Sequence, residues 1–377
     1  MPPTVHLHQT ISDIAEADWQ SCAASDNPFI SHAFLKCMED SGSLGKRTGW
    51  HPQHMVIKNG NTIGAIVPMY IKDNSFGEYV FDHAWADALI RIGGQYYPKL
   101  QIAVPFSPVP GPRLLRAPNS SITIADIANT LSTLCRKQSM SSVHITFCTR
   151  EEAAALSDAG WIERRDMQFH WVNQDYKSFD DFLAGLSSSH RKNIRRERRD
   201  VLAHGLTFHT LVGDDIKPHH WDAFYDFYLA TIERKWGSAY LTREFFALLS
   251  QRLGNQVVLM MAEHDGRLVA GALNLKSSTT LYGRNWGSIG NWPFLHFELC
   301  YYRAIDFAIE HGLKVVEAGA QGTHKIQRGY IPTPTYSAHW IAHEGLSKAV
   351  EHFVTQERAA MGDHMTALSE LAPFKKT

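Results

Sequence analysis

The sequence predicts a mixed α/β protein that contains two copies of one structural unit. His54–Tyr70 has the pattern of strand, turn and strand around Asn59-Gly60, and Leu259–Leu275 repeats that pattern around Asp265-Gly266. Both dipeptides suit tight hairpins of type I′. Each hairpin is followed by a helical segment and then an apolar strand. The 377 residues fit two domains of about 100–200 residues each.

The first copy is expected to form a domain of residues 1–170. In its hairpin, Ile63–Val67 aligns with Val269–Leu273 of the second copy, and Tyr79–Phe81 is expected to be a strand that corresponds to Leu281–Tyr282. The spacing of apolar residues indicates the other elements. These are helices at 11–22, 32–39 and 122–135, a strand at 143–147 and a closing segment at 161–165.

The second copy is expected to form a domain of residues 171–377. Helices are predicted at 179–204, 220–234 and 243–252 before its hairpin, and at 294–309 after it, followed by a strand at 314–317. Residues 346–371 read as an amphipathic packing helix. The hairpins supply antiparallel strands, and the later helix and strand add a βαβ connection. Each domain should therefore be a mixed sheet covered by helices.

Composition excludes several classes of protein. No apolar run approaches the roughly 20 residues of a spanning helix, and Met1–His6 lacks a basic region followed by an apolar one, so we expect a cytoplasmic protein. With 37 basic and 38 acidic residues, bulk charge does not favour polyanions, and any RNA contact requires a local patch. The five scattered cysteines fit buried thiols in a reducing compartment.

Glu317–Tyr330 is the strongest candidate for a ligand site. An apolar strand ends in Glu317 and runs into three glycines and a cationic cluster that includes His324, Lys325 and Arg328. Open α/β sheets bind ligands at the carboxyl ends of strands. The alternative is a glycine-rich turn with solvated charges. Three further segments, at 81–85, 105–113 and 282–287, concentrate polar and aromatic residues, and the last two also contain glycine or proline. This composition is typical of functional loops.

A basic stretch between Arg191 and Arg199 is the second candidate. Helical spacing would align Arg191, Arg195 and Arg198 on one face, with Lys192, Arg196 and Arg199 beside them. Like charges at this spacing repel, so phosphate groups of a substrate or of RNA are expected to offset them. The alternative is a solvated face that is paired with acids from elsewhere in the chain.

Several catalytic motifs are absent from the sequence. There is no phosphate-binding Gly-x-x-x-x-Gly-Lys-Ser/Thr, no dinucleotide-binding Gly-x-Gly-x-x-Gly after a strand and no Gly-x-Ser-x-Gly. His296-x-Glu298 matches the start of a zinc deaminase signature, but no Pro-Cys-x-x-Cys follows. We therefore expect neither a metal nor a tightly bound cofactor.

The chain resembles, from end to end, the bacterial predicted N-acyltransferase family in the FemAB-like branch of the GNAT superfamily. The resemblance rests on eight blocks in order over about 300 residues. They are Asn27-Pro28-Phe29 with Ser31, residues 97–101, Pro105-Phe106 with residues 111–115, residues 193–198, residues 240–246, residues 281–284, residues 295–298 with 300–302, and residues 317–329.

The resemblance implies two tandem GNAT-like domains, in agreement with the repeat. In a GNAT unit the strand before the central helix separates from its neighbour, and the acyl donor enters the gap with its carbonyl held by backbone N–H groups. Here that strand would be Leu281–Gly287 and that helix Leu295–His311. Acetyl-CoA enzymes usually carry Arg/Gln-x-x-Gly-x-Gly/Ala between the two, whereas this chain has Ser288–Pro293.

The donor stays open between aminoacyl-tRNA and acyl-CoA. Fem-type transferases take aminoacyl groups from tRNA and also lack the acetyl-CoA motif, and their Lys-x-x-Phe-Gly is similar to Lys325-x-x-Arg328-Gly329. The long charged heptad insertion that some of them carry is absent here. The expected acceptor is an amine-bearing small molecule or peptide.

Acyl transfer to an amine requires a base, an oxyanion stabiliser and an acid for the leaving group. The predicted catalytic residues are Glu317, Glu298, His296, His324 and Lys325. The two glutamates are the favoured bases, because partial burial raises a carboxyl pKa towards the working pH. Cys300 is disfavoured as a nucleophile, since it lies inside an apolar helical run.

Substrate binding is assigned to three groups of residues. Acceptor contacts are expected in a groove between the domains, donor or oxyanion contacts in the second domain, and phosphate contacts on the basic stretch. The groups are Asp82, His83, Trp85 and Arg113; then Tyr282, Arg284, Trp286, Gln321 and Arg328; then Arg191, Lys192 and Arg196. The alternative function is a non-catalytic protein of the same fold that binds RNA or a phosphorylated glycan.

Overall fold

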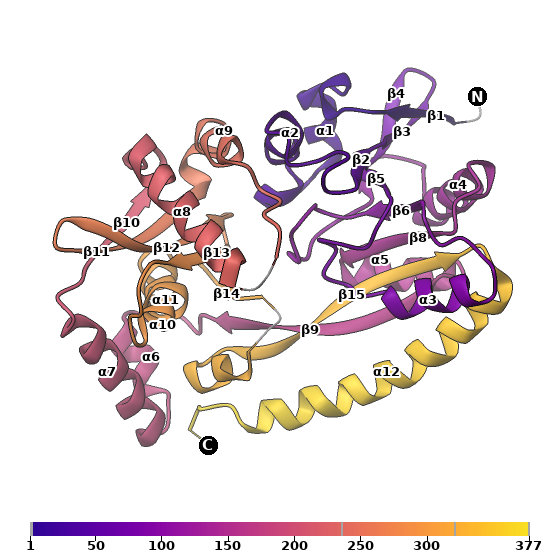
Figure 1. Ribbon diagram of the computed structural model, residues 1–377. Coiled ribbons are helices and arrows are strands. Elements are labelled where there is room, and N and C mark those ends of the chain that lie inside the picture. The colour runs from indigo at the N-terminus through magenta and orange to yellow at the C-terminus, as the bar shows by residue number, and fades with distance from the viewer. Residues whose placement is uncertain (1–2, 235–236, 320–321, 376–377) are drawn as a thin grey trace. The chain divides into compact units, whose positions relative to one another are not determined.

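The computed structural model describes residues 3–234, 237–319 and 322–375, and it confirms the mixed α/β fold (Figure 1). The chain divides into two compact units. Unit 1 comprises residues 1–166 and 334–363, and unit 2 comprises residues 167–333 and 364–377. The units are defined by contacts, and the assignment of the repeated domains to 1–170 and 171–377 stays a prediction. None of the described helices is long and apolar enough to cross a membrane.

Unit 1 contains two sheets. The smaller has the strand order β1-β3-β4-β7; in the larger, β2, β5, β6 and β8 are neighbours in that order, β6 and β8 run parallel, and the second half of β15 pairs with β8. The elements are β1 (Thr4–His8), η1 (Ile11–Asp13), α1 (Glu16–Cys22), η2 (Pro28–Ile30), α2 (His32–Asp40), β2 (Trp50–Pro52), β3 (His54–Asn59), β4 (Thr62–Val67), β5 (Met69–Lys72), α3 (His83–Arg91), β6 (Lys99–Ile102), β7 (Leu115–Arg116), α4 (Ile124–Lys137), β8 (Ser142–Cys148) and α5 (Arg150–Asp158).

Three elements run from one unit into the other: β9 (Ile162–Val172), β15 (Ile331–Ile341) and α12 (Glu344–Glu370). Unit 2 has one sheet in the order β10-β11-β12-β13-β14-β9, in which β13 and β14 are parallel. Its elements are α6 (Phe179–Ala184), α7 (Ser188–Leu202), β10 (Thr207–Val212), η3 (Gly213–Asp215), α8 (Pro218–Arg234), α9 (Arg243–Leu253), η4 (Gly254–Gln256), β11 (Val257–His264), β12 (Arg267–Lys276), β13 (Thr280–Ser288), α10 (Leu295–Phe297), η5 (Glu298–Tyr302), α11 (Arg303–Glu310), β14 (Val315–Glu317) and η6 (Thr323–Arg328).

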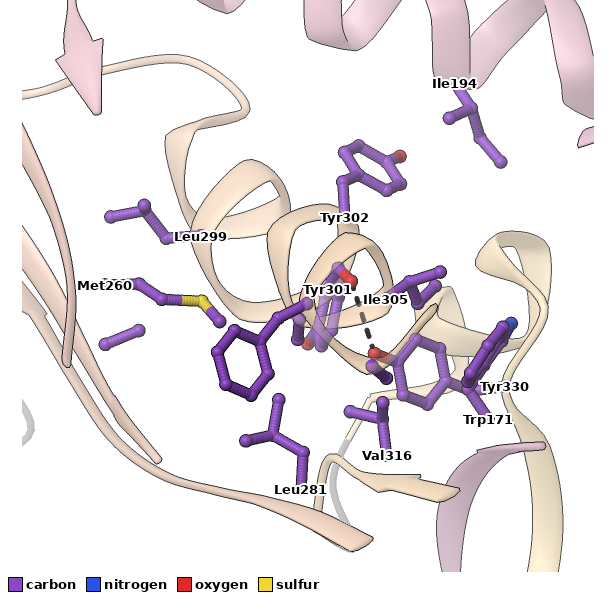
Figure 2. Packing of buried hydrophobic residues seen from close by; sticks show 14 of the residues in the cluster. Trp171, Ile194, Met260, Leu281, Leu299, Tyr301, Tyr302, Ile305, Val316 and Tyr330 are labelled. Atoms are coloured by element: carbon purple, nitrogen blue, oxygen red, sulfur yellow. Dashed lines mark hydrogen bonds between the residues drawn. The ribbon is translucent and has the colours of Figure 1, made fainter. Parts of the chain in front are cut away.

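The two faces of the unit 2 sheet carry different helices, because side chains alternate along each strand. On one face, Met260, Ala272, Leu281 and Val316 pack with the helical segment 295–310 in one buried cluster (Figure 2). On the other face, α8 packs against β12 and β13 (Figure 1). Residues that alternate with this cluster, such as Tyr282 and Glu317, therefore point away from the segment 295–310.

The two predicted hairpins form, but only one has the predicted turn. At Asp265-Gly266 both residues have positive φ (49° and 74°), as type I′ requires. The first hairpin pairs Asn59 with Thr62, so its loop residues are Gly60 and Asn61, and of these Gly60 alone has positive φ. The type I′ turn predicted at Asn59-Gly60 is wrong.

Four other predictions of local structure are corrected. Tyr79–Phe81 is a loop and not a strand, and β6 is the strand that pairs in parallel with β8. The predicted helix at 179–204 is two helices, α6 and α7, because the backbone is extended at Ser187, the N-cap of α7 (φ −62°, ψ 155°). The helix predicted at 11–22 is likewise divided, into η1 and α1. The predicted loop at 81–85 contains the start of α3.

Candidate functional site

The centre of the unit 2 sheet opens where two parallel strands separate. β13 pairs with β14 over Thr280–Tyr282 and Val315–Glu317 alone. Beyond this point β13 continues along β12 to Ser288, whereas β14 ends. A cavity of about 90 Å³ lies at this point, which we call the β13–β14 cleft. Its lining residues are Ala272, Leu273, Asn274, Gly283, Arg284, Asn285, Trp286, His296, Cys300, Tyr301 and Ala318.

A β-bulge places Arg284 in the wall of the cleft. β12 pairs Asn274 with Gly283 and Leu273 with Asn285, so Arg284 is the extra residue on β13. Bulges occur next to active sites, where they redirect a side chain. Arg284 and Trp286, two residues predicted to bind substrate, therefore line the same cavity.

The other wall of the cleft is a helix with a π-helical turn. α10, η5 and α11 form one run from Leu295 to Glu310, with the π turn over Glu298–Tyr302. His296, Cys300 and Tyr301 line the cavity, and the His296 ring lies edge-on to Trp286 at 5.2 Å between centroids. Burial raises the pKa of the Cys300 thiol to about 12, so this cysteine is a poor nucleophile at neutral pH, as predicted.

The N-terminus of this helix has little capacity left to bind an anion. Phe294 has a φ of 64°, and its carbonyl accepts from the amides of Phe297 and Glu298 at 2.9 and 3.0 Å. The amide of Leu295 donates to Trp292 at 3.2 Å. Free amides at a helix N-terminus are what bind phosphate groups in proteins. Two of the amides that a helix N-terminus usually leaves free, those of Leu295 and Phe297, are thus bonded within the chain, whereas the Glu298 amide makes the first ordinary helical bond.

Lys325 holds the chain immediately after β14. Its ammonium group donates to the carbonyls of Ala318 and Gly319, and its side chain is almost fully buried. Burial lowers the pKa of Lys325 to about 8. Ala318 lines the cleft, so Lys325 supports the cleft wall and places a positive charge beside it.

Glu317 lies on the opposite face of the sheet from the helix that carries His296. In the sheet it is the direct neighbour of Tyr282 on β13 and of His170 on β9, and its Oε1 is 4.0 Å from His170 Nε2. Burial, with a smaller contribution from Lys325, lowers the pKa of His170 to about 4. His170 is therefore neutral near pH 7.

Two predicted site residues form buried ion pairs with helix α7. Glu298 accepts from Arg198 at 3.0 and 3.1 Å and lies 3.1 Å from Arg303 Nε. Arg328 donates to both oxygens of Glu197, at 2.8 and 2.9 Å. These contacts favour structural roles for Glu298 and Arg328, because their charged atoms are already engaged. Their assignment to catalysis and to donor binding stays a prediction.

The outer face of α7 keeps part of its charge exposed. Arg198 is paired with Glu298 and Asp306, and Arg195 with Asp180. Lys192 and Arg196 are exposed, and within the described part of the chain no ion pair involves either of them. They stand at i and i+4 on one face of the helix. Arg191, half-buried, donates to the carbonyl of Leu186 at 3.3 Å.

The four residues assigned to acceptor binding belong to unit 1, and three of them are buried there. Asp82 accepts from Tyr96 and Lys99. Although burial opposes its ionisation, the Lys99 ammonium holds the pKa of Asp82 well below its usual range. Trp85 packs edge-on to His339 at 5.0 Å, and Arg113 donates to several backbone carbonyls. His83 is exposed. Their role in acceptor binding stays a prediction.

Two polar residues of the cleft, Tyr301 and Asn274, were not predicted from the sequence. One predicted site residue lies outside the described part of the chain. Tyr301 lines the cavity, and its hydroxyl is 3.0 Å from His324 Nε2. Asn274 is buried at the bulge, and its one sequence signal is that it interrupts an apolar strand. Gln321, a predicted substrate contact, lies outside the described residues.

Comparison with known proteins gives one family and several solved structures of similar fold. Residues 10–376 match the model of the FemAB-like family, described as peptidoglycan biosynthesis and recognition. FemX is similar in structure (10% identity, 93% of this chain and 100% of that chain, TM-score 0.55). A second similar structure is the C-terminal domain of a putative lysylphosphatidylglycerol synthetase from Agrobacterium fabrum (10% identity, 90% of this chain and 96% of that chain, TM-score 0.55). A third is L-PGS from Bacillus licheniformis (9% identity, 91% of this chain and 96% of that chain, TM-score 0.51). No curated protein matches the sequence.

Proposed function

Because the chain belongs to the FemAB-like family, we propose that it transfers an aminoacyl group from tRNA to an amine of a peptidoglycan precursor. The observation that carries the proposal is the β13–β14 cleft, an opening where β14 ends and β13 continues, with a cationic and a histidine side chain in its walls. Separated strands expose backbone groups that can hold an acyl carbonyl. The family description supports a peptidoglycan acceptor.

The helix N-terminus favours aminoacyl-tRNA over acyl-CoA as the donor. An acyl-CoA brings a pyrophosphate, which needs free backbone amides at a helix start. Here the amides of Leu295 and Phe297, which a helix start usually leaves free, already donate to Trp292 and Phe294. The name of a structural neighbour, lysylphosphatidylglycerol synthetase, also describes a product that carries an aminoacyl group.

The residues near the cleft supply the groups that such a transfer requires. We assign Glu317 as the base for the attacking amine, since it lies at the end of β14 beside a histidine that is neutral near pH 7. Arg284 in the cleft wall and Lys325 behind it place positive charge where the oxyanion forms. His296 in the cleft wall is the alternative base.

The exposed cations of α7 support a nucleic-acid donor. Lys192 and Arg196 are adjacent on one helical face and are exposed, so both are available to phosphates. Replacing these two residues is a suitable test of tRNA binding, because both side chains are exposed and their replacement disturbs no buried contact. Glu197 and Arg198, their neighbours in sequence, are internal and unsuitable for this purpose.

The decisive experiment supplies both donors to the full-length protein. Bulk tRNA charged with mixed radiolabelled amino acids, or radiolabelled acetyl-CoA, is incubated with a soluble peptidoglycan precursor peptide, and label in the peptide is measured. We expect transfer from charged tRNA and none from acetyl-CoA. The Glu317→Gln variant should lose about 10²–10⁴ in rate while it still binds tRNA. Tight tRNA binding without transfer from either donor would establish the non-catalytic RNA-binding alternative.

A further inference from the structure

Tyr301, in the wall of the β13–β14 cleft, forms a polar pair with His324 that the proposed chemistry has not used. Tyr301 lines the cleft, and its Oη lies 3.0 Å from Nε2 of His324. Tyr301 is 3% exposed, whereas His324 is only partly buried. A tyrosine that lines a cavity and has its phenol hydroxyl bonded to an imidazole has the components of a proton donor with a fixed orientation.

The surrounding residues hold the Tyr301 ring in place. Phe297 stacks on it with centroids 6.0 Å apart, and His296 and Tyr330 lie at 5.3 and 5.4 Å. The Tyr330 hydroxyl also donates to the Tyr301 carbonyl at 3.5 Å, which Figure 2 marks with a dashed line. This bond satisfies a carbonyl inside the π-helical turn. Ring and backbone of Tyr301 are therefore both fixed.

The π-helical turn directs adjacent tyrosines to different surroundings. Tyr302 bonds Glu197 and Arg328 on the side of α7, and its ring points toward Ile194 in Figure 2. Tyr301 instead lines the cleft. Single π turns inside α-helices occur frequently at functional sites. Tyr302 is thus a natural internal control for Tyr301.

We propose that Tyr301 is the general acid that protonates the leaving oxygen of an ester donor, with His324 as the residue that positions it. This inference rests on the transferase function proposed above. In the step, the amine nitrogen bonds to the carbonyl carbon, and the C–O ester bond breaks with its electron pair moving to the ribose oxygen. That oxygen takes the Tyr301 proton. The phenolate then regains the proton that the amine gave up to the base.

His324 can orient the Tyr301 hydroxyl if its imidazole is the Nε2–H tautomer. Partial burial, with Arg328 and Lys325, lowers the pKa of His324, so the ring is neutral near pH 7. If Nε2 carries the proton, it donates to Tyr301 Oη and leaves the phenol proton free to point into the cleft. The same N–H stabilises the phenolate as it forms. Acid and base then act from opposite faces of the sheet, since Glu317 points away from the helix that carries Tyr301.

The test varies the leaving group. An alkoxide needs a proton, whereas a thiolate leaves without one. Tyr301→Phe should therefore lower kcat about 10²–10⁴-fold with bulk aminoacyl-tRNA, and by less than about tenfold with an alanyl N-acetylcysteamine thioester, with KM unchanged in both cases. Tyr302→Phe, the matched control, should leave both rates unchanged. His324→Gln should lower the rate with the ester donor alone.

Two outcomes overturn the inference in distinguishable ways. Equal losses on ester and thioester in Tyr301→Phe refute the acid role and leave the transferase function standing. Wild-type protein that consumes neither donor refutes the function and the acid role together. ¹⁵N NMR of the imidazole is an independent readout: we expect Nε2–H for His324 in wild-type protein and a changed tautomer ratio in Tyr301→Phe. An Nδ1–H tautomer in wild-type protein contradicts the proposed orientation.

Discussion

Replacing Glu197 by Gln is predicted to destabilise unit 2 by about 3 kcal/mol, because it leaves the Arg328 guanidinium buried without a counter-charge. Glu197 and Arg328 are 8% and 5% exposed, and one guanidinium nitrogen contacts both carboxylate oxygens, at 2.8 and 2.9 Å. Removing one partner of a buried pair typically costs about 3–5 kcal/mol. Gln retains one carbonyl acceptor, which places this variant at the lower end.

The effect is measured as a shift of the unit 2 melting transition. For a unit of this size each kcal/mol corresponds to about 2–4 °C, so Glu197→Gln should lower Tm by about 6–12 °C. The matched control is Asp180→Asn, which breaks an ion pair of the same helix whose side chains are 58% and 78% exposed. Exposed pairs contribute about 0–1 kcal/mol, so the control should shift Tm by no more than a few degrees.

A double variant separates charge from packing. Changing Glu197 and Arg328 both to Met removes the pair without leaving a buried charge, and it should recover a large part of the lost stability. If Glu197→Gln instead melts like the control, the guanidinium is not held by this carboxylate. Arg328 would then be available for an anionic donor, as the sequence alone suggested.

Three further outcomes are expected. The paired Lys192→Ala and Arg196→Ala variant should reduce the slope of log Kd for tRNA against log salt by about one unit for each phosphate that is no longer bound, measured by filter binding, and an unchanged slope would indicate a merely solvated face. Burial lowers the pKa of His170 from 6.5 to about 4. The stability that comes from keeping this imidazole neutral is therefore present above pH 6.5, and about 3 kcal/mol of it is lost as the pH falls towards 4. In denaturant titrations at several pH values, the free energy of unfolding of His170→Gln should lack this dependence on pH. Gly287→Ala should cost about 1–3 kcal/mol or more, because the added Cβ would overlap the backbone carbonyl of Phe227; chemical denaturation that matches the wild type would contradict this close packing.

Local patterns in the sequence predicted elements well and turn geometry less well. The helix at 243–252 was predicted within one residue of α9 (Arg243–Leu253), because a Thr242 cap and regular apolar spacing both act locally. The dipeptide Asn59-Gly60 did not reveal which two residues form the loop, since the register is set by pairing across the hairpin. The loop at Tyr79–Phe81 was mistaken for a strand because its residues have high β-propensity, which context overrides.

The candidate site could be predicted in position but not in the roles of its charged residues. Glycines after an apolar strand indicated the end of β14, and Arg284 does line the cleft. The partner of Arg328 is Glu197, 131 residues earlier in the chain, and no local pattern identifies such a partner. Tyr301 was missed because nothing in the apolar run 299–302 predicts a π-helical turn.

The two units differ at the same point of their topology, which bears on the number of active sites. In unit 1 the parallel strands β6 and β8 correspond in order to β13 and β14. Beyond them, the Arg113 guanidinium donates to the carbonyls of Val109, Gly111, Pro112 and Thr146. One carbonyl of β8 and three carbonyls of the loop that follows β6 are thus satisfied by a buried side chain of the protein itself. The cleft of unit 2 is lined by small, polar and aromatic side chains around a cavity. This difference favours the cleft of unit 2 for the proposed acyl transfer, and the hydrogen bonds of Arg113 favour a structural role for it in unit 1. Its assignment to acceptor binding stays a prediction.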